Sequence, residues 1–279
     1  MLHSQKDIEK CAISASDGDI GQVTDLYFDD QAWAVRYLIV DSGSWLAERK
    51  VLISPISIRS ADWQAQTLAV GITRDQVKNS PSIDTDQPVS RQHEAQYFGY
   101  YGYPTYWDGG GMWGGGVLPM GLYPGYAALA HGTAEQNSEE QVKQQADDDP
   151  HLRSCAAIIG YHIHTSDGEV GHVEGFLIDD ESWAIRYLVV NTSNWWLGHH
   201  VLIAPQWIDG VHWLDQTVTV DISREALQTA PAYDAATDLN RQYETNLYTH
   251  YARAVLVAGR PGPAARSLML RVSPCPRSS

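Results

Sequence analysis

Cysteine is scarce in this sequence. The three cysteines, Cys11, Cys155 and Cys275, are far apart and form no Cys-x-x-Cys pair. An odd and scattered set of this kind predicts neither a disulfide framework nor a zinc knuckle. We therefore expect the chain to work in a reducing compartment, the cytoplasm.

Long apolar runs are missing as well. No window approaches the roughly 20 uninterrupted apolar residues of a membrane-spanning helix. The first residues, MLHSQKDIEKC, hold no apolar stretch of signal-peptide length. Hydrophobic residues nevertheless make up 43% of a chain of 279 residues, which is enough to build real cores. The sequence thus predicts a globular, soluble protein with no membrane insertion.

Positive charge is also in short supply. Lys and Arg number 19 against 34 Asp and Glu, which gives a formal net charge of −15. The basic stretch that does occur is the tail after Tyr251, where arginines stand without a single acidic residue. An acidic body repels phosphate backbones. We therefore expect no nucleic-acid partner.

Familiar catalytic motifs are absent. The sequence contains no Gly-x-Ser-x-Gly and no His-Glu-x-x-His. Its glycine-rich run GGGMWGGG lacks the lysine and the strand-to-helix setting that a phosphate-binding loop requires. The sequence predicts that the protein is not an enzyme and uses no cofactor.

What the sequence does contain is an internal repeat. Residues 17–101 match residues 167–251 at a constant offset of 150, without a gap and with about a third of the positions identical. The first copy begins DGDIGQVTDLYFDDQAWAVRYLIVDSGSW and the second DGEVGHVEGFLIDDESWAIRYLVVNTSNW. A register kept over this length indicates duplication of a whole folding unit.

Each repeat is predicted to be β-structure followed by short helices. Asp17-Gly18 is a hairpin dipeptide, because glycine tolerates the positive φ of a tight turn. In WAVRYLIV both alternating faces are largely apolar, which predicts a strand buried on both sides, in a closed barrel or against a partner. We expect strands at 21–28, 33–40, 51–54 and 67–70 and helices at 75–79 and 91–101, the second capped by Ser90, with equivalents in the second repeat.

The repeats divide the chain into four parts. We expect a first barrel with trailing helices at 1–101 and a second at 151–251. Between them, 102–150 is rich in glycine and aromatic residues and then acidic, which predicts a flexible, disordered linker. The Pro- and Arg-rich tail at 252–279 departs from the repeat and is predicted to be a disordered basic extension.

Both repeats resemble the PRC-barrel family. They share Asp-Gly-x-x-Gly-x-Val, Asp-Asp before a Trp, Arg-Tyr-Leu-x-Val and Val-Leu-Ile-x-Pro. The resemblance implies an all-β fold of two tandem small PRC-type barrels. The family includes the cytoplasmic domain of the photosynthetic reaction centre H subunit and a domain of a ribosome maturation factor. It therefore implies barrels that dock on other proteins, at the cytoplasmic side of a membrane complex or on a ribosome-related complex.

Arginines recur inside the apolar strands of both repeats. An unpaired guanidinium is costly to bury, so each arginine is expected to pair with a carboxylate. The alternatives are that these arginines extend to the surface or clamp a ligand. The predicted structural ion pairs join Arg36 to Asp29 or Asp30, and Arg186 to Asp179 or Asp180.

Tryptophans follow the central strand in each repeat. Each tryptophan is expected either to cover the core as a lid or to belong to an exposed contact patch. The contact patch is suggested by the adjacent pair in the second repeat, because two neighbouring tryptophans are hard to bury together. The predicted interface residues are Trp45, Leu46, Trp195, Trp196 and Leu197. His162 and His164 share a strand face as a potential metal pair, but the first repeat has no equivalent, and we assign no metal, catalytic or cofactor-binding residue.

These observations favour a non-catalytic scaffold that binds protein partners. The alternatives are a metal- or small-ligand-binding barrel and an uncharacterised hydrolase. We also expect the two barrels to pair within the chain, because a single barrel of about 70 residues buries little of its surface and is marginally stable. The alternative to pairing is two independent barrels, each covered by its own trailing helix.

Overall fold

The structure is a computed structural model that describes residues 1–47, 49–81, 89–107, 112–113, 151–192, 199–234 and 239–251. It is mostly β-structure, in two sheets with a few short helices, as the repeat predicts. We name residues 1–113 unit 1 and residues 151–251 unit 2. Positions 114–150 of the predicted linker and the whole predicted tail, 252–279, lie outside the described residues.

Unit 1 alternates short strands with short helices. The expected strand at 67–70 is found with these bounds, and the helices expected at 75–79 and 91–101 are present. The sequence did not predict the strands near residues 2, 12 and 58. The elements are β1 (Leu2–Ser4), α1 (Gln5–Ile8), β2 (Ala12–Ala15), β3 (Gly18–Asp29), β4 (Ala34–Asp41), η1 (Gly43–Leu46), β5 (Lys50–Ile53), η2 (Pro55–Ser57), β6 (Ile58–Asp62), β7 (Thr67–Val70), α2 (Arg74–Asn79) and α3 (Arg91–Tyr101).

Unit 2 repeats this order of elements. None of the helices in the described part of either unit has the length and apolar character needed to cross a membrane. The elements are β8 (Leu152–Ser154), α6 (Cys155–Ile158), β9 (His162–Thr165), β10 (Gly168–Asp179), β11 (Ile185–Asn191), β12 (His200–Ile203), η4 (Pro205–Trp207), β13 (Ile208–His212), β14 (Thr217–Val220), α7 (Arg224–Gln228) and α8 (Arg241–His250).

The two sheets have the same strand order and are open. Unit 1 runs β5-β4-β3-β2-β7-β6, and unit 2 runs β12-β11-β10-β9-β14-β13. Among the described strands, β5 and β6 at the two ends of the first path do not pair with each other, and neither do β12 and β13. The expectation of closed barrels is therefore corrected. The three-residue helices η2 and η4 join these end strands and turn the chain from one edge of the sheet to the other.

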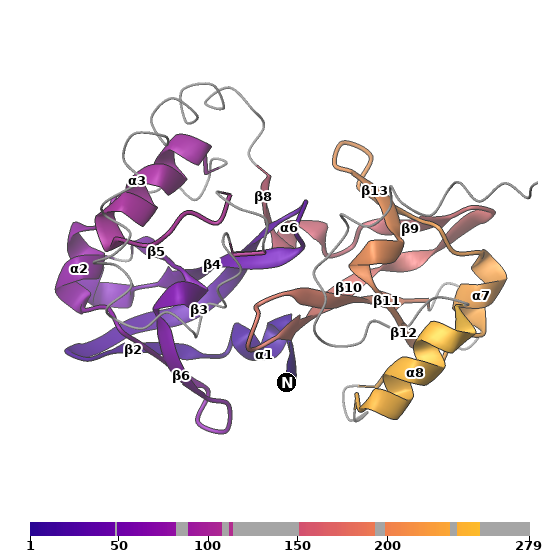
Figure 1. The fold of residues 1–279 in the computed structure, drawn as a ribbon, viewed down its shortest axis with the longest axis horizontal. Helices are drawn as coiled ribbons and strands as arrows, with labels where there is room; N and C mark the ends of the chain where they lie inside the picture. The colour runs from indigo at the N-terminus through magenta and orange to yellow at the C-terminus, as the bar shows by residue number, and fades with distance from the viewer. Residues whose placement is uncertain are drawn as a thin grey trace, which may run out of the picture.

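Each sheet gains a seventh strand from the other unit. β1 pairs antiparallel with β10, with Leu2 opposite Asp179. β8 pairs antiparallel with β3, with Leu152 opposite Asp29. In Figure 1, β8 and α6 lie among the strands of unit 1, whereas α1 lies beside β10 of unit 2. The first strand of each repeat is thus exchanged reciprocally.

A second reciprocal contact lies between the starts of β4 and β11. The Val35 amide donates to the Trp183 carbonyl at 2.8 Å, and the Ile185 amide donates to the Trp33 carbonyl at 2.8 Å. Each of these bonds becomes the other when 150 is added to or subtracted from the residue numbers. The contacts at the junction are therefore those of two units related by a pseudo-twofold axis.

The Asp-Gly-x-x-Gly motif has a steric reason. Gly18 has φ 135° at the β2–β3 hairpin, and Gly21 has φ 155° where its backbone passes the carbonyl of Asp41. A Cβ on Gly21 would collide with that carbonyl oxygen. Gly168 and Gly171 repeat both conformations in unit 2. Because only glycine avoids the collision, the motif fixes how β3 crosses β4.

Helix α3 covers the central strand of unit 1. Ser90 caps the helix by accepting the His93 amide, as expected from the sequence. Residues 34–40 of β4 are all buried. On the helix side the rings of Tyr37 and Tyr97 meet edge-to-face at 5.3 Å. The strand's second apolar face is thus explained by packing within the chain.

The chain beyond α3 packs back onto unit 1. The helix ends at Gly102, which has a left-handed φ of 65°, and Tyr106 and Trp113 are then 4% exposed each. The expectation of a flexible linker from residue 102 is corrected for residues 102–107 and 112–113. Their aromatic side chains cover apolar and positively charged side chains of unit 1. The amino-acid composition of the segment does not reveal these contacts.

Candidate functional site

The junction between the units carries a charged corner at Asp30. His151 Nδ1 lies 3.1 Å from its carboxylate, and Arg153 Nε donates to it at 3.1 Å. The Arg153 guanidinium also lies 4.5 Å from the ring centre of Trp213. Burial raises the pKa of Asp30, and the charges of Arg153 and His151 oppose that rise. The partners of Asp30 therefore come from unit 2, and not from Arg36 as expected.

At the equivalent corner the aspartate, Asp180, belongs to unit 2 and its partners come from unit 1. Its carboxylate binds the amino group of Met1 and lies 3.2 Å from His3 Nε2. The His3 ring stacks on Trp63 at 3.6 Å. A basic residue of the exchanged strand thus lies between an aspartate of one unit and a tryptophan of the other at both corners.

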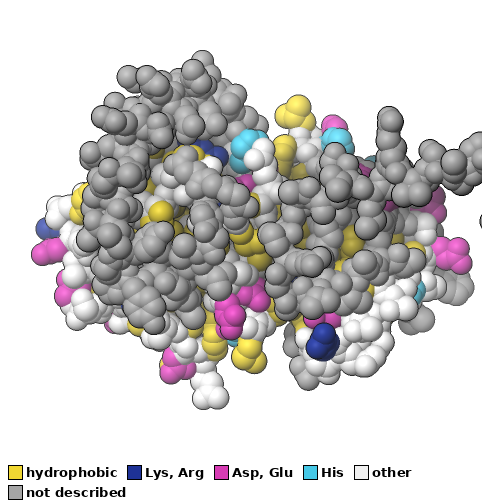
Figure 2. Space-filling model, in the orientation of Figure 1, with side chains coloured by type: hydrophobic (Ala, Val, Ile, Leu, Met, Phe, Trp, Pro, Cys, Tyr) yellow, Lys and Arg dark blue, Asp and Glu magenta, His cyan; other side chains and the backbone are white. Residues whose placement is uncertain are grey.

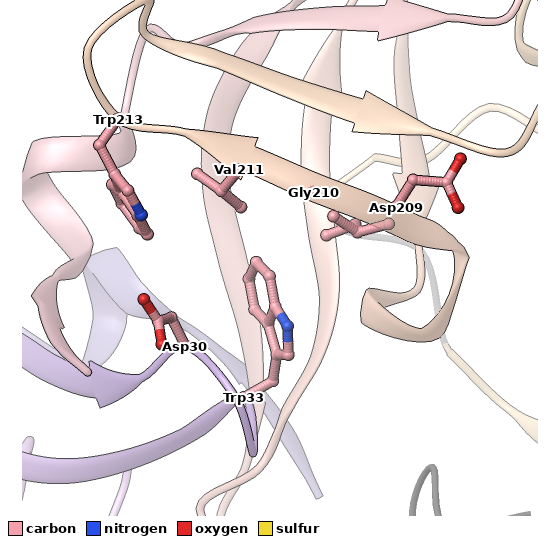
Figure 3. Close-up of a pocket in the computed structure, with 7 residues that line it drawn as sticks. Asp30, Trp33, Asp209, Gly210, Val211 and Trp213 are labelled. Carbon is pink, nitrogen blue, oxygen red and sulfur yellow. The ribbon is translucent and has the colours of Figure 1, made fainter. Parts of the chain in front are cut away.

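A cavity of about 210 Å³ opens beside the Asp30 corner. Figure 3 shows the Asp30 carboxylate directed toward Trp213 and the Trp33 ring directed toward Val211 on β13. Because Asp30 is already compensated by Arg153, the cavity offers aromatic surface next to a neutralised carboxylate. Its lining comprises Asp30, Trp33, Ile208, Asp209, Gly210, Val211 and Trp213.

A buried carboxylate lies between β4 and α3. Glu94 accepts hydrogen bonds from Tyr37 Oη at 3.1 Å and Tyr106 Oη at 2.5 Å, and from Arg91 Nη1 at 2.9 Å. Burial raises the pKa of Glu94 to about 7, against the lowering effect of Arg91. Arg91 and Glu94 are three positions apart on α3 and recur as Arg241 and Glu244, a spacing typical of a helical ion pair, but their burial follows only from the structure.

Arg36 continues this cluster across β4. Its Nη2 donates to Asp29 Oδ2 at 3.0 Å and its Nη1 to the Met112 carbonyl at 2.5 Å. The guanidinium lies 3.8 Å from the ring centre of Tyr106 and 4.8 Å from that of Trp113. With its side chain 2% exposed, Arg36 is covered by the segment that follows α3.

The equivalent cluster in unit 2 is more open. Arg186 Nη2 lies 3.7 Å from Glu244 Oε1, and Tyr187 Oη donates to the same oxygen at 2.8 Å. The side chains of Arg186 and Glu244 are 30% and 26% exposed. The expected partners of Arg186 are elsewhere: Asp179 accepts amides of its own turn, and Asp180 faces the N-terminus.

Trp45 lies as a lid on its own unit. Its indole Nε1 donates to the Ile20 carbonyl at 2.5 Å, and the Arg74 guanidinium lies 4.2 Å from its ring centre. Leu46 packs half-buried against the core. The other expected contact residues, Trp195, Trp196 and Leu197, lie outside the described residues.

The two strand histidines share one carboxylate. His162 Nδ1 lies 2.7 Å and His164 Nε2 3.9 Å from oxygens of Glu169. Within the described ranges, no group of three or more His, Cys, Asp or Glu residues is arranged to hold a metal ion. The pair is accounted for by the neighbouring Glu169.

Several residues of these clusters were missed from the sequence. Tyr106 and Trp113 lie beyond the end of the repeat, so no internal comparison marked them. Arg153 and Trp213 are separated by about 60 positions and meet only across the junction. The recurrence of aspartate at 30 and 180 and of tryptophan at 63 and 213 was the available signal for the corners.

Two sheets of one strand order, each completed by a strand of the other, define a duplicated small β-domain protein. The family model described as PRC-barrel domain matches residues 3–69, which run from β1 into β7. A PRC-barrel domain is therefore present in unit 1. No curated protein matches this chain.

Proposed function

We propose that this chain is a non-catalytic scaffold that binds other proteins through two PRC-barrel units held as an intramolecular pair. The second PRC-barrel is supported by the gap-free repeat and by the common strand order of the two sheets. The observation that carries the proposal is the reciprocal pairing of β1 with β10 and of β8 with β3. Because each unit completes the other's sheet, both units present their outer surfaces at a fixed spacing.

Surface charge supports a protein partner over nucleic acid. In Figure 2, Asp and Glu side chains are more frequent than Lys and Arg among the described atoms of the visible face. The cytoplasm is supported by Cys11 and Cys155, which are free and buried. Burial raises the pKa of Cys11 to about 11, so the thiol is protonated and unreactive at neutral pH.

Affinity capture of the tagged full chain from native lysate, separated into cytosolic, membrane and ribosomal fractions, tests this function. We expect a stoichiometric protein partner that binds the purified chain again in isolation. Metal analysis of the same preparation distinguishes a metal-binding barrel, and a scaffold is expected to carry no stoichiometric metal.

A variant that disturbs the pairing of the units is the full chain with Leu152–Ser154 replaced by glycines, which removes side chains from the exchanged strand. The partner is expected to bind this variant more weakly, because the fixed spacing of the units is lost. The scaffold proposal is wrong if no captured protein binds the purified chain again, or if stoichiometric metal is found instead.

A further inference from the structure

We propose that the Arg186–Glu244 cluster of unit 2 is a docking site for a tyrosine- and tryptophan-containing segment of a partner protein. The inference rests on the proposed scaffold function and names the chemistry of its partner. It derives from a comparison of the two units, because unit 1 already holds such a segment at the equivalent place.

Unit 1 supplies the template. Tyr106 donates its hydroxyl to Glu94 at 2.5 Å and places its ring 3.8 Å below the Arg36 guanidinium. Trp107 packs edge-to-face on Phe98 at 5.6 Å, and the Arg91 guanidinium lies 4.6 Å from its ring centre. A Tyr-Trp pair is thus held by one carboxylate, two guanidinium groups and one aromatic ring.

Unit 2 keeps the carboxylate and both guanidinium groups of this receiving surface, whereas the ring at the fourth position is 3% exposed and packs on Trp207 at 5.1 Å. At the offset of 150, Arg36 corresponds to Arg186, Arg91 to Arg241, Glu94 to Glu244 and Phe98 to Tyr248. The spacing of β11 and α8 is also kept, because Tyr187 reaches Glu244 at 2.8 Å as Tyr37 reaches Glu94 at 3.1 Å.

The aromatic segment itself is not repeated in the sequence. The positions corresponding to Tyr106 and Trp107 are Leu256 and Val257, and residues 252–279 contain no Tyr, Trp or Phe. In agreement, the side chains of Arg186 and Glu244 are 30% and 26% exposed, against 2% for Arg36 and 1% for Glu94. Because the Arg186–Glu244 ion pair is partly exposed and its N···O distance is 3.7 Å, its guanidinium N–H groups and carboxylate oxygens can form hydrogen bonds to a partner.

The chemistry of the partner follows from these groups. A tyrosine hydroxyl can donate to Glu244 while its ring lies under Arg186, as a cation–π contact. A following tryptophan can lie on the exposed Arg241 guanidinium as a second cation–π contact. Tyrosine and tryptophan are also the residues that contribute most at protein interfaces.

The test uses the full chain and a labelled peptide with the sequence of residues 101–113, YGYPTYWDGGGMW, as the probe. Fluorescence anisotropy is expected to show saturable one-to-one binding. The substitution Glu244→Gln, and separately a peptide with phenylalanine in place of its Tyr106, are each expected to weaken binding about tenfold, because a hydrogen bond to a charged group is lost.

The matched control is Gln242→Ala on the same helix. Gln242 is exposed and its side-chain amide donates to Asn246 at 2.9 Å, so this substitution is expected to leave affinity unchanged. Binding that is absent, or that is unaffected both by Glu244→Gln and by the peptide change, would overturn the docking site. The peptide change keeps this test valid even if a protein variant fails to fold.

The chain has a second Tyr-Pro-x-Tyr run at Tyr123–Tyr126 that resembles Tyr103–Tyr106. If the peptide binds only after Tyr123→Ala and Tyr126→Ala, the site belongs to the chain itself and the partner inference is wrong. Failure of the peptide to bind while lysate capture still yields a rebinding partner overturns this inference and leaves the scaffold function standing.

Discussion

Glu94 connects burial of a single carboxyl to the stability of unit 1. Its pKa of about 7 lies above its ordinary value of 4.5, so the folded chain holds this proton more tightly than the unfolded chain. The stabilising contribution is fully present below pH 4.5 and is lost as the pH rises toward 7. The loss amounts to about 3 kcal/mol. We expect wild type to lose this much relative to Glu94→Gln between pH 4.5 and 8, in urea unfolding at several pH values.

A buried neutral residue of the same helix separates this effect from simple damage to the core. Phe98→Leu is expected to lower the free energy of unfolding by about 1 kcal/mol at every pH, because no titrating group changes. If the difference between wild type and Glu94→Gln is the same at pH 4.5 and pH 8, the raised pKa is not present in solution.

Gly21 shows how one backbone position fixes the crossing of β3 over β4. A Cβ there collides with the Asp41 carbonyl oxygen, and φ 155° is strained for other residues. We expect Gly21→Ala to lower the free energy of unfolding by at least about 2 kcal/mol in chemical denaturation. Gly99→Ala in α3, where a Cβ meets open space, is the control and is expected to stabilise by about 0.5 kcal/mol. Equal effects would contradict the close approach.

At the scale of the element, β8 belongs to unit 2 in sequence and to the sheet of unit 1 in space. Replacing Leu152–Ser154 by glycines is expected to raise amide hydrogen exchange at Asp30, whose amide donates to the His151 carbonyl at 2.9 Å. The increase is expected to exceed about tenfold, because an edge strand that no longer pairs opens readily. The Ala12 amide, bonded to the Gln66 carbonyl within unit 1, is the internal control. Unchanged exchange at Asp30 would mean that β8 does not hold this edge.

At the scale of the molecule, strand exchange makes the two halves dependent on each other. Residues 1–113 and 151–251, expressed separately, each lack the strand that completes their sheet. We expect each half to form dimers, because an uncovered strand edge recruits a second copy. Mixing the halves should yield a one-to-one complex. Light scattering after size exclusion measures this, and monomeric halves as stable as the full chain would refute the dependence.

The sequence by itself determined the repeat, the β-rich composition of each unit, the capped helix after Ser90 and the glycine motif, because these depend on neighbours within one turn or one strand. It also predicted that buried arginines need partners. It did not identify those partners, since Arg186 lies beside Glu244 and Asp30 beside Arg153, at separations of 58 and 123 positions.

Only the tertiary structure decided where the first strand of each repeat goes. Three residues such as Leu2–Ser4 can pair with any free edge, because main-chain hydrogen bonds carry no sequence code. The same holds for residues 103–107 and 112–113, whose aromatic side chains are typical of a linker in the sequence and contact a guanidinium and a carboxylate in the structure. Long-range pairing depends on which surfaces stay uncovered after the local elements have formed, and that is a property of the whole chain.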